Sequence, residues 1–398
     1  MKKLFFIAAI AGAALVSCTK NELAPSATEQ HEITFSNPVS QVVTKVNDLV
    51  PATYTTTIPF AVYADHHFDN FATAATAANT DEAAFSSYMR GTNSEGVVVT
   101  YDDTEITIDD ETYDKYWKPV SKYYWPTKGY LSFAAYSPSS IADDMSIEYT
   151  AKNGVYIAEY TTPEVGAQHD LMLSNRTTDQ LRSDMGINVG GTSYDGVNIA
   201  FNHVLSAISF IVKTDEDENK DYAKEGYSII LDELTVKNAY NKGSLTQFAT
   251  NYDTAVNLST VWTKVWNENT TGYKVNSTAV TLTDSKNTTN KAVGQWATNN
   301  QADLILIPQA LDHNGETAGG EVYVEVKYTV KHADMPAKGI QYTHNLPLGQ
   351  SFGTWEPNTR YLYTIIIGME EIVFAPTIVT DWAAPVGTDP SNKEDINL

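Results

Sequence analysis

The sequence predicts an all-β chain built from two β-sandwich domains in tandem, and three observations carry this prediction. Short segments that alternate apolar and polar residues recur on both sides of one acidic run, Asp215–Asp221. No segment longer than about ten residues shows the apolar spacing of a helix. Tyrosine is frequent, with 24 residues, and it favours strands, as threonine does. Strands at short spacing on either side of a polar linker indicate two sandwiches, each with its own core.

Residues 1–18 have the features of a bacterial lipoprotein signal peptide. A basic start and an apolar run, 4–16, precede the small residue Ser17, and Cys18 is the only cysteine in the chain. The run is too short to span a bilayer, which is typical of a secretory signal; we expect it at 1–17, with cleavage between Ser17 and Cys18. Leu15-Val16-Ser17-Cys18 resembles a lipobox, which predicts that Cys18 carries the lipid that anchors the mature protein. The alternative is an ordinary signal peptide in which Cys18 is incidental.

Composition limits the partners. The chain has 398 residues and a formal net charge of −23. This length is more than one all-β core usually organises, which favours two domains. The negative charge argues against nucleic acid and anionic membranes as partners, because both select clustered lysine and arginine. A single cysteine allows no disulfide within the chain, so stability has to come from packed strands.

The N-terminal domain is predicted to span 31–214. Residues 18–30 show no periodicity and are expected to form a flexible, lipidated stalk. The first alternating segment starts at Ile33-Thr34-Phe35, and the Ala- and Thr-rich stretch 71–88 is expected to hold one short helix. Further strands are expected at 58–63, 131–136, 169–173 and 201–212.

An aromatic block at 113–136 stands out within this domain. It includes Trp117, Trp125 and Tyr136. Such rings can stack on sugars, but more often they form a core and pair across strands. We interpret the block as core and keep a sugar-binding platform as the alternative.

The acidic run is the strongest change in composition, and we place the domain boundary there. The C-terminal domain is expected at 226–383. In its segment 321–330, valines alternate with polar residues, which predicts a strand with one face on a core. The Asn- and Thr-rich stretch 251–300 is expected to be a surface excursion anchored by a few tryptophans, and the polar tail 384–398 is expected to be disordered.

The sequence contains no complete catalytic or metal-binding motif, so it predicts neither an enzyme nor a cofactor. Gly191-Thr192-Ser193-Tyr194-Asp195 lacks the final glycine of a nucleophile elbow. The cluster 65–69, Asp-His-His-Phe-Asp, has metal-ligand residue types, but adjacent histidines on a strand point to opposite faces, and we interpret it as a solvated loop. The acidic run has calcium-loop spacing, but Lys220 and Gly226 replace the glycine and glutamate that such a loop needs. A solvated linker is the preferred interpretation, and no metal site is predicted.

Several motifs, in a characteristic order, resemble the Bacteroidales fimbrillin-like (Mfa-like) proteins. In addition to the lipobox and Ile33-Thr34-Phe35, they are Tyr124-Trp125-Pro126, the segment 131–138 (LSFAAYSP), His169-Asp170-Leu171-Met172, Phe201-Asn202-His203-Val204-Leu205-Ser206, Leu306-Ile307-Pro308-Gln309, the segment 355–364 (WEPNTRYLYT) and Val379-Thr380-Asp381-Trp382. The match covers residues 1–382.

The resemblance implies two transthyretin-like β-sandwiches and export to the outer membrane as a lipoprotein exposed on the cell surface. It also implies a role in pili or adhesion, with other fimbrillin-like subunits as partners. Family members that polymerise exchange strands after a protease cuts behind an arginine and removes the first strand. In physical terms this is β-augmentation of an emptied groove.

The sequence departs from the polymerising pattern at two places. The first arginine after the lipobox is Arg90, far beyond a single first strand, and only Lys45 lies near the expected cut. These two residues are the candidate processing sites. The tail after Trp382 lacks the alternation that a donor strand needs. We therefore expect an anchor, tip or accessory subunit rather than a stalk subunit, with an unidentified host or bacterial surface ligand. The alternative function is a surface lipoprotein that binds glycans for nutrient uptake.

Overall fold

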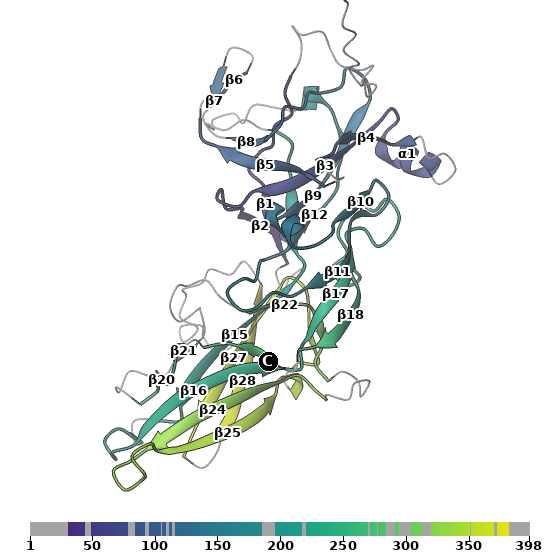
Figure 1. The fold of residues 1–398 in the computed structure, drawn as a ribbon. Coiled ribbons are helices and arrows are strands. Elements are labelled where there is room, and N and C mark those ends of the chain that lie inside the picture. The colour runs from purple at the N-terminus through teal and green to yellow at the C-terminus, as the bar shows by residue number, and fades with distance from the viewer. Residues whose placement is uncertain are drawn as a thin grey trace, which may run out of the picture.

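The structure is a computed structural model (Figure 1). The ranges it describes are 31–43, 49–78, 84–91, 95–104, 106–108, 111–113, 116–184, 196–216, 220–269, 271–276, 278–283, 291–293, 304–312, 320–350, 352–369 and 372–381. Ser17, Cys18 and Lys45 lie outside these ranges.

Strands dominate the regular secondary structure of the described chain, which confirms the predicted all-β class. The expected short helix is present as α1 (Phe71–Ala78), and the described ranges hold no other α-helix. Three 3₁₀ turns are η3 (Ser139–Asp143), η4 (Arg182–Asp184) and η6 (Leu348–Gln350). Within these ranges, no helix combines the length and the apolar character that a bilayer span requires.

A large sheet organises the N-terminal part, in the order β2-β1-β14-β12-β9-β3-β5-β8, with β13 beside β9 and β4 beside β3. Its strands are β1 (Val39–Val43), β2 (Leu49–Thr53), β3 (Phe60–His67), β4 (Ser86–Met89), β5 (Val97–Asp102), β8 (Tyr116–Pro119), β9 (Tyr130–Ser137), β12 (Met172–Ser174), β13 (Thr177–Gln180) and β14 (Ala200–His203). A separate hairpin joins β6 (Ile106–Ile108) and β7 (Glu111–Tyr113).

Both faces of this sheet are covered, so its central strand β3 is buried along its whole length. Phe60 and Val62 enter one core, which we call the N-terminal core. Ala61 and Tyr63, which point the other way, enter a second core shared with a smaller sheet. Alternate side chains of β3 therefore point into two different cores, instead of one core and solvent.

The smaller sheet joins strands from both sides of the acidic run. Its order is β10-β11-β17-β18. The strands are β10 (Glu148–Thr150), β11 (Gly154–Thr161), β17 (Tyr240–Thr246) and β18 (Trp262–Glu268). The expectation of a surface excursion at 251–300 is wrong in part, because this stretch contributes β18 to the sheet, and its Val261 and Tyr273 are buried in cores. Trp262 anchors it as expected, donating a hydrogen bond from Nε1 to the Val204 carbonyl at 2.5 Å.

Two facing sheets form the C-terminal sandwich. One contains β15 (Ser206–Thr214), β21 (Lys291–Val293), β22 (Leu304–Leu306), β27 (Thr359–Ile367) and β28 (Ile372–Asp381). The other contains β16 (Ser228–Lys237), β19 (Tyr273–Lys274), β20 (Val280–Thr281), β24 (Tyr323–Lys331) and β25 (Ile340–Pro347). A short pair, β23 (Gln309–Ala310) and β26 (Thr354–Trp355), lies beside them.

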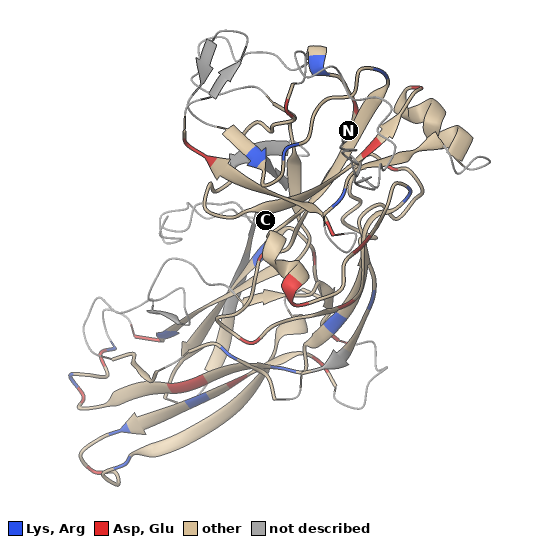
Figure 2. Cartoon of the chain, turned by 45° about the horizontal axis from the view of Figure 1, so that its top comes forward, with Lys and Arg blue, Asp and Glu red and all other residues tan. Residues whose placement is uncertain are grey.

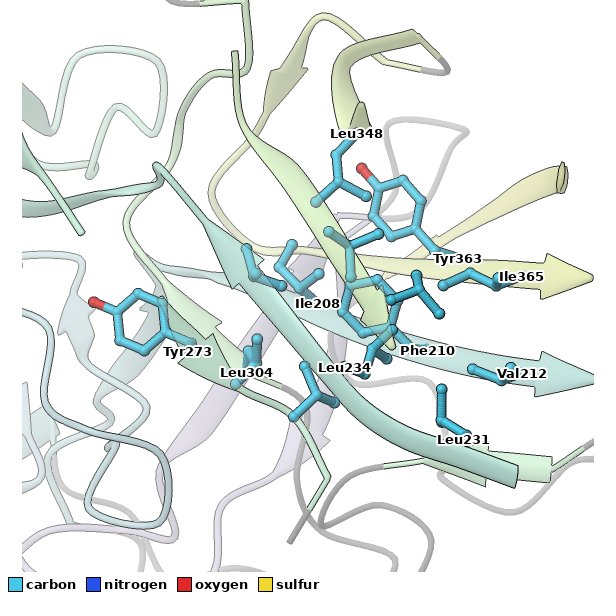
Figure 3. Close-up of a cluster of buried hydrophobic side chains, with 14 of the residues drawn as sticks. Ile208, Phe210, Val212, Leu231, Leu234, Tyr273, Leu304, Leu348, Tyr363 and Ile365 are labelled. Carbon is cyan, nitrogen blue, oxygen red and sulfur yellow. The ribbon is translucent and has the colours of Figure 1, made fainter. Parts of the chain in front are cut away.

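The core of this sandwich lies between its two sheets, where Phe210 and Tyr363 stack at 5.6 Å between ring centroids (Figure 3). The alternation predicted for 321–330 is confirmed, because Val324 and Val326 are fully buried in this core.

The single long strand expected at 201–212 is wrong, because the chain changes sheets within it. β14 ends at His203 in the N-terminal sheet, and β15 begins at Ser206 and pairs with β27 in the C-terminal sandwich. Val204 and Leu205 between them are both fully buried, which breaks the alternation. The change of sheet therefore precedes the acidic run, which instead connects β15 to β16 within the C-terminal sandwich. The division into two separately folding domains, at 31–214 and 226–383, stays a prediction, as does their transthyretin-like arrangement.

Candidate functional site

The first described segment, residues 31–36, lies in a groove of the N-terminal sandwich. Six backbone hydrogen bonds hold it there. On one side Phe35 exchanges two of them with Trp117 of β8, at 2.9 and 3.2 Å. On the other side Val197 donates to the Thr34 carbonyl at 3.0 Å and accepts from the Ser36 N–H at 3.1 Å. The segment therefore pairs on both edges, as an inner strand of a sheet does.

This pairing closes the large sheet. Trp117 belongs to β8, at one end of the strand order, while Val197 lies just ahead of β14, near the other end. Phe35 bridges both, antiparallel to Trp117 and parallel to Val197. Without the segment, two rows of backbone donors and acceptors would face an open groove, and unpaired strand edges of this kind accept a new strand.

Two apolar side chains of the segment fill the groove. Ile33 is 1% exposed and Phe35 is fully buried. The Phe35 ring meets Phe60 and Phe133 edge-on, with centroid distances of 5.7 and 5.8 Å. Such edge-to-face contacts stabilise a core beyond the area they bury. The segment is thus a structural part of the N-terminal core.

Gly196 allows the segment to approach its neighbour closely. A Cβ at this position would lie 2.6 Å from the Thr34 carbonyl oxygen and 2.8 Å from the Phe35 nitrogen. Both are backbone atoms, so neither can move aside without displacing the segment. Sequence reasoning missed this residue, although a glycine directly before the apolar alternation of Val197 and Ile199 is a signal of close backbone approach.

Arg90, one of the two candidate processing sites, follows β4 and has its guanidinium group bound within the fold. It donates to the carbonyl of Ala64 at 2.8 Å and pairs with the Asp65 carboxylate at 2.5 Å. The group also lies 4.5 Å from the ring centroid of Tyr149. These contacts link β4 and β3 of the large sheet to β10 of the smaller one. The second candidate, Lys45, and the lipidation residue Cys18 lie outside the described residues.

The interpretation of 65–69 as a solvated loop is wrong for residues 65–67, whereas Phe68 and Asp69 are exposed. Asp65, His66 and His67 are buried in β3, at 2, 4 and 1% exposure. His67 Nε2 lies 2.7 Å from the Ser132 hydroxyl and Nδ1 lies 2.7 Å from the Asp69 carbonyl. Burial lowers the pKa of His67, because the charged imidazolium loses its hydration. Local residue types suggested solvent exposure, but β3 is central and covered on both faces.

The described carboxylates of the acidic run bind protein donors. Asp215 accepts from the Tyr222 hydroxyl at 2.6 Å, and Glu216 accepts from the Tyr222 backbone N–H at 2.7 Å. Asp217 and Asn219, the intermediate positions of the calcium-like pattern, lie outside the described residues. Across the described ranges, no group of three or more metal-ligating side chains is found.

The interpretation of the aromatic block as core is confirmed for its largest rings. Trp117, Trp125 and Tyr136 are 1, 4 and 1% exposed. Trp117 and Trp125 belong to the N-terminal core, and Tyr136 belongs to the core shared with the smaller sheet. These three rings therefore cannot serve as a sugar-stacking platform.

A hollow of about 600 Å³ opens at the end of the N-terminal core. His203 lies on its wall, with Nδ1 2.7 Å from the Asp170 carboxylate. The Ser137 hydroxyl on the same wall is 2.5 Å from that of Tyr54. Sequence reasoning noted the motifs around Asp170 and His203 but not their pairing, because the two residues lie 33 positions apart and meet only through the sheet.

The fold and the groove define a β-sandwich protein whose own residues 31–36, in an extended conformation, complete its N-terminal sheet. Residues 63–382 match a family model described as fimbrillin-like. Since this match covers most of the chain, the protein belongs to the fimbrillin-like family. No curated protein gives a significant match.

The chain is similar to several solved structures, and the first one described here shows the same fold. A fimbrial protein from Bacteroides vulgatus is 17% identical, covering 88% of this chain and 100% of that one, with a TM-score of 0.52. A candidate cell adhesion protein from Bacteroides uniformis is 13% identical, with coverages of 90% and 100% and a TM-score of 0.43. The tip fimbrial protein Mfa3 from Porphyromonas gingivalis, truncated at its C-terminus, is 10% identical, with coverages of 88% and 100% and a TM-score of 0.34.

Proposed function

We propose that this protein is a fimbrial or adhesion subunit, anchored by lipid in the outer membrane, that keeps its first segment in place. Membership of the fimbrillin-like family supports a fimbrial or adhesive role at the cell surface. Within that role, the protein acts as an anchor, tip or accessory subunit rather than as a stalk subunit. Its partners are other fimbrillin-like subunits.

The observation that carries this proposal is that residues 31–36 are paired and buried in the groove of the N-terminal sandwich. Release of the segment breaks six backbone hydrogen bonds and exposes Ile33 and Phe35 to water. Exposing apolar surface costs about 25 cal/mol per Å², and buried backbone groups left without partners cost more still. Strand exchange with another subunit is therefore slow unless a protease first removes the segment.

The surroundings of Arg90 support the same conclusion. A trypsin-like cut requires an arginine whose side chain and flanking backbone can enter the protease. In this fold the Arg90 guanidinium forms an ion pair with Asp65 and donates a hydrogen bond to the Ala64 carbonyl. A cut at Arg90 thus requires local unfolding of β3 and β4, and we expect the mature protein to escape it.

The test is mass analysis of the N-terminus of protein taken from the cell surface. The proposal expects a mature form that begins at Cys18, with acyl groups attached. A dominant form beginning at Val46 or Gly91, found in SDS-resistant ladders of high mass, identifies a polymerising stalk subunit and contradicts the proposal.

A further inference from the structure

Strand β25 forms an open edge of the C-terminal sandwich. It pairs with β24 over eight consecutive positions without a register shift. It ends the strand order β19-β16-β24-β25, and in the described ranges no strand pairs with its outer side. Figures 1 and 2 both place it at the rim of the molecule.

From Ile340 to Leu346 this edge lacks the features by which proteins usually prevent edge-to-edge pairing, and proline occurs only at its last position, Pro347. The strand reads Ile-Gln-Tyr-Thr-His-Asn-Leu-Pro and contains no lysine, arginine, aspartate or glutamate. Ile340 is 40% exposed and Tyr342 is 39% exposed. Soluble proteins blunt a long edge with inward charges, bulges or a covering loop. A regular, uncharged edge with half-exposed apolar side chains is instead a template for another strand.

We propose that a second copy of this chain pairs with this edge, β25 against β25, antiparallel about Thr343. The two-fold axis then relates the strands so that the two sheets continue as one. Residue 342 of one copy lies opposite 344 of the other, 341 opposite 345, and 340 opposite 346. This surface is separate from the groove that holds residues 31–36.

In this register, each side chain of β25 faces a chemically similar side chain of the second copy. On the face toward the core, Tyr342 meets His344 and Ile340 meets Leu346. On the outer face, Gln341 meets Asn345, and Thr343 meets its own copy. Every pair is aromatic with aromatic, aliphatic with aliphatic, or polar with polar, and none places like charges opposite each other.

Similar ring contacts already occur within one chain. Tyr328 of β24 stacks on Tyr342 at 5.3 Å and on His344 at 5.8 Å between ring centroids. The pairing of Tyr342 with His344 of the second copy extends this row of rings across the new edge. A second copy of the strand is therefore a partner of suitable chemistry, and an isologous contact of this kind closes after two subunits.

One pair of strands makes a small interface, at the low end of the sizes of specific complexes, below about 1,200 Å² in total. Self-association is thus weak in dilute solution, and tethering both copies to one surface strengthens it by raising their effective concentration. The expected state is a concentration-dependent dimer rather than a permanent one.

Sedimentation of the purified full chain over a range of concentrations tests the proposal. The weight-average mass should rise from the mass of one chain toward twice that value. Thr343→Lys places two lysines opposite each other at the axis and should keep the protein monomeric, and so should Thr343→Glu. An equimolar mixture of the two variants should dimerise again, because each lysine then meets a glutamate.

Thr73→Lys is the matched control, since it makes the same charge change at an exposed position of helix α1. It should dimerise as the unaltered chain does. A chain that stays monomeric at every concentration overturns the proposal. So does a Thr343→Lys variant that still dimerises, or a mixture that fails to restore the dimer although both variants are folded by circular dichroism.

Discussion

Truncation of Phe35 is the most direct test of the role given to the first segment. The ring is fully buried, and it meets Phe60 and Phe133 edge-on. Replacement of a buried phenylalanine by alanine removes the transfer free energy of the ring and leaves a cavity, at a cost of about 3–5 kcal/mol. Because rigid rings line this site and collapse poorly into a void, we expect Phe35→Ala to fall at the upper end of that range.

Such a loss is a large part of the stability of an ordinary domain, which is about 5–15 kcal/mol. Urea unfolding followed by tryptophan fluorescence measures it, since Trp117 pairs directly with Phe35. Phe68→Ala is the control, because Phe68 is 66% exposed. We expect the control to change the free energy of unfolding by less than about 0.5 kcal/mol. If Phe35→Ala unfolds at the same urea concentration as Phe68→Ala, the segment does not stabilise the groove and the reasoning fails.

Three further predictions address the groove, the lipid and the stability of the fold at acid pH. Gly196→Ala should displace residues 31–36 and speed their removal by limited proteolysis, whereas Gly353→Ala, whose Cβ would meet no atom within 4 Å, should not. Metabolic labelling with a fatty-acid analogue should mark the unaltered chain but not Cys18→Ser, and equal labelling of both contradicts lipidation at this residue. Hydrogen bonds from two lysines, chiefly Lys327, lower the pKa of Glu233 to about 2, so its charge stabilises the fold above its usual pKa and this contribution is lost as pH falls toward 2. Glu233→Gln should therefore cost about 1 kcal/mol at pH 7 and progressively less below about pH 4.5, as measured by denaturant unfolding.

Local pattern was enough to predict the class of the fold. The alternation through Val324 and Val326 identified a strand with one face on a core, because a period of two directly reports a difference between two faces. The rings of Trp117 and Trp125 were interpreted as core on residue type alone, and they are buried. The order of motifs along the chain was sufficient for the family.

Tertiary structure decided which strands meet. Residues 201–212 form one apolar-rich stretch in the sequence, yet the chain leaves one sheet at His203 and enters another at Ser206. The burial of Asp65 depends on layers contributed by distant segments that cover both faces of β3.

Residues 31–36 show the same limit of prediction from the sequence alone. Ile33-Thr34-Phe35 is recognisable as a strand, but its partners lie at Trp117 and Val197, far along the chain. A local pattern reports how a residue is exposed, whereas pairing depends on the free energy of contacts between segments that only the whole fold brings together. The groove, the close approach at Gly196 and the open edge at β25 are therefore properties of the tertiary structure.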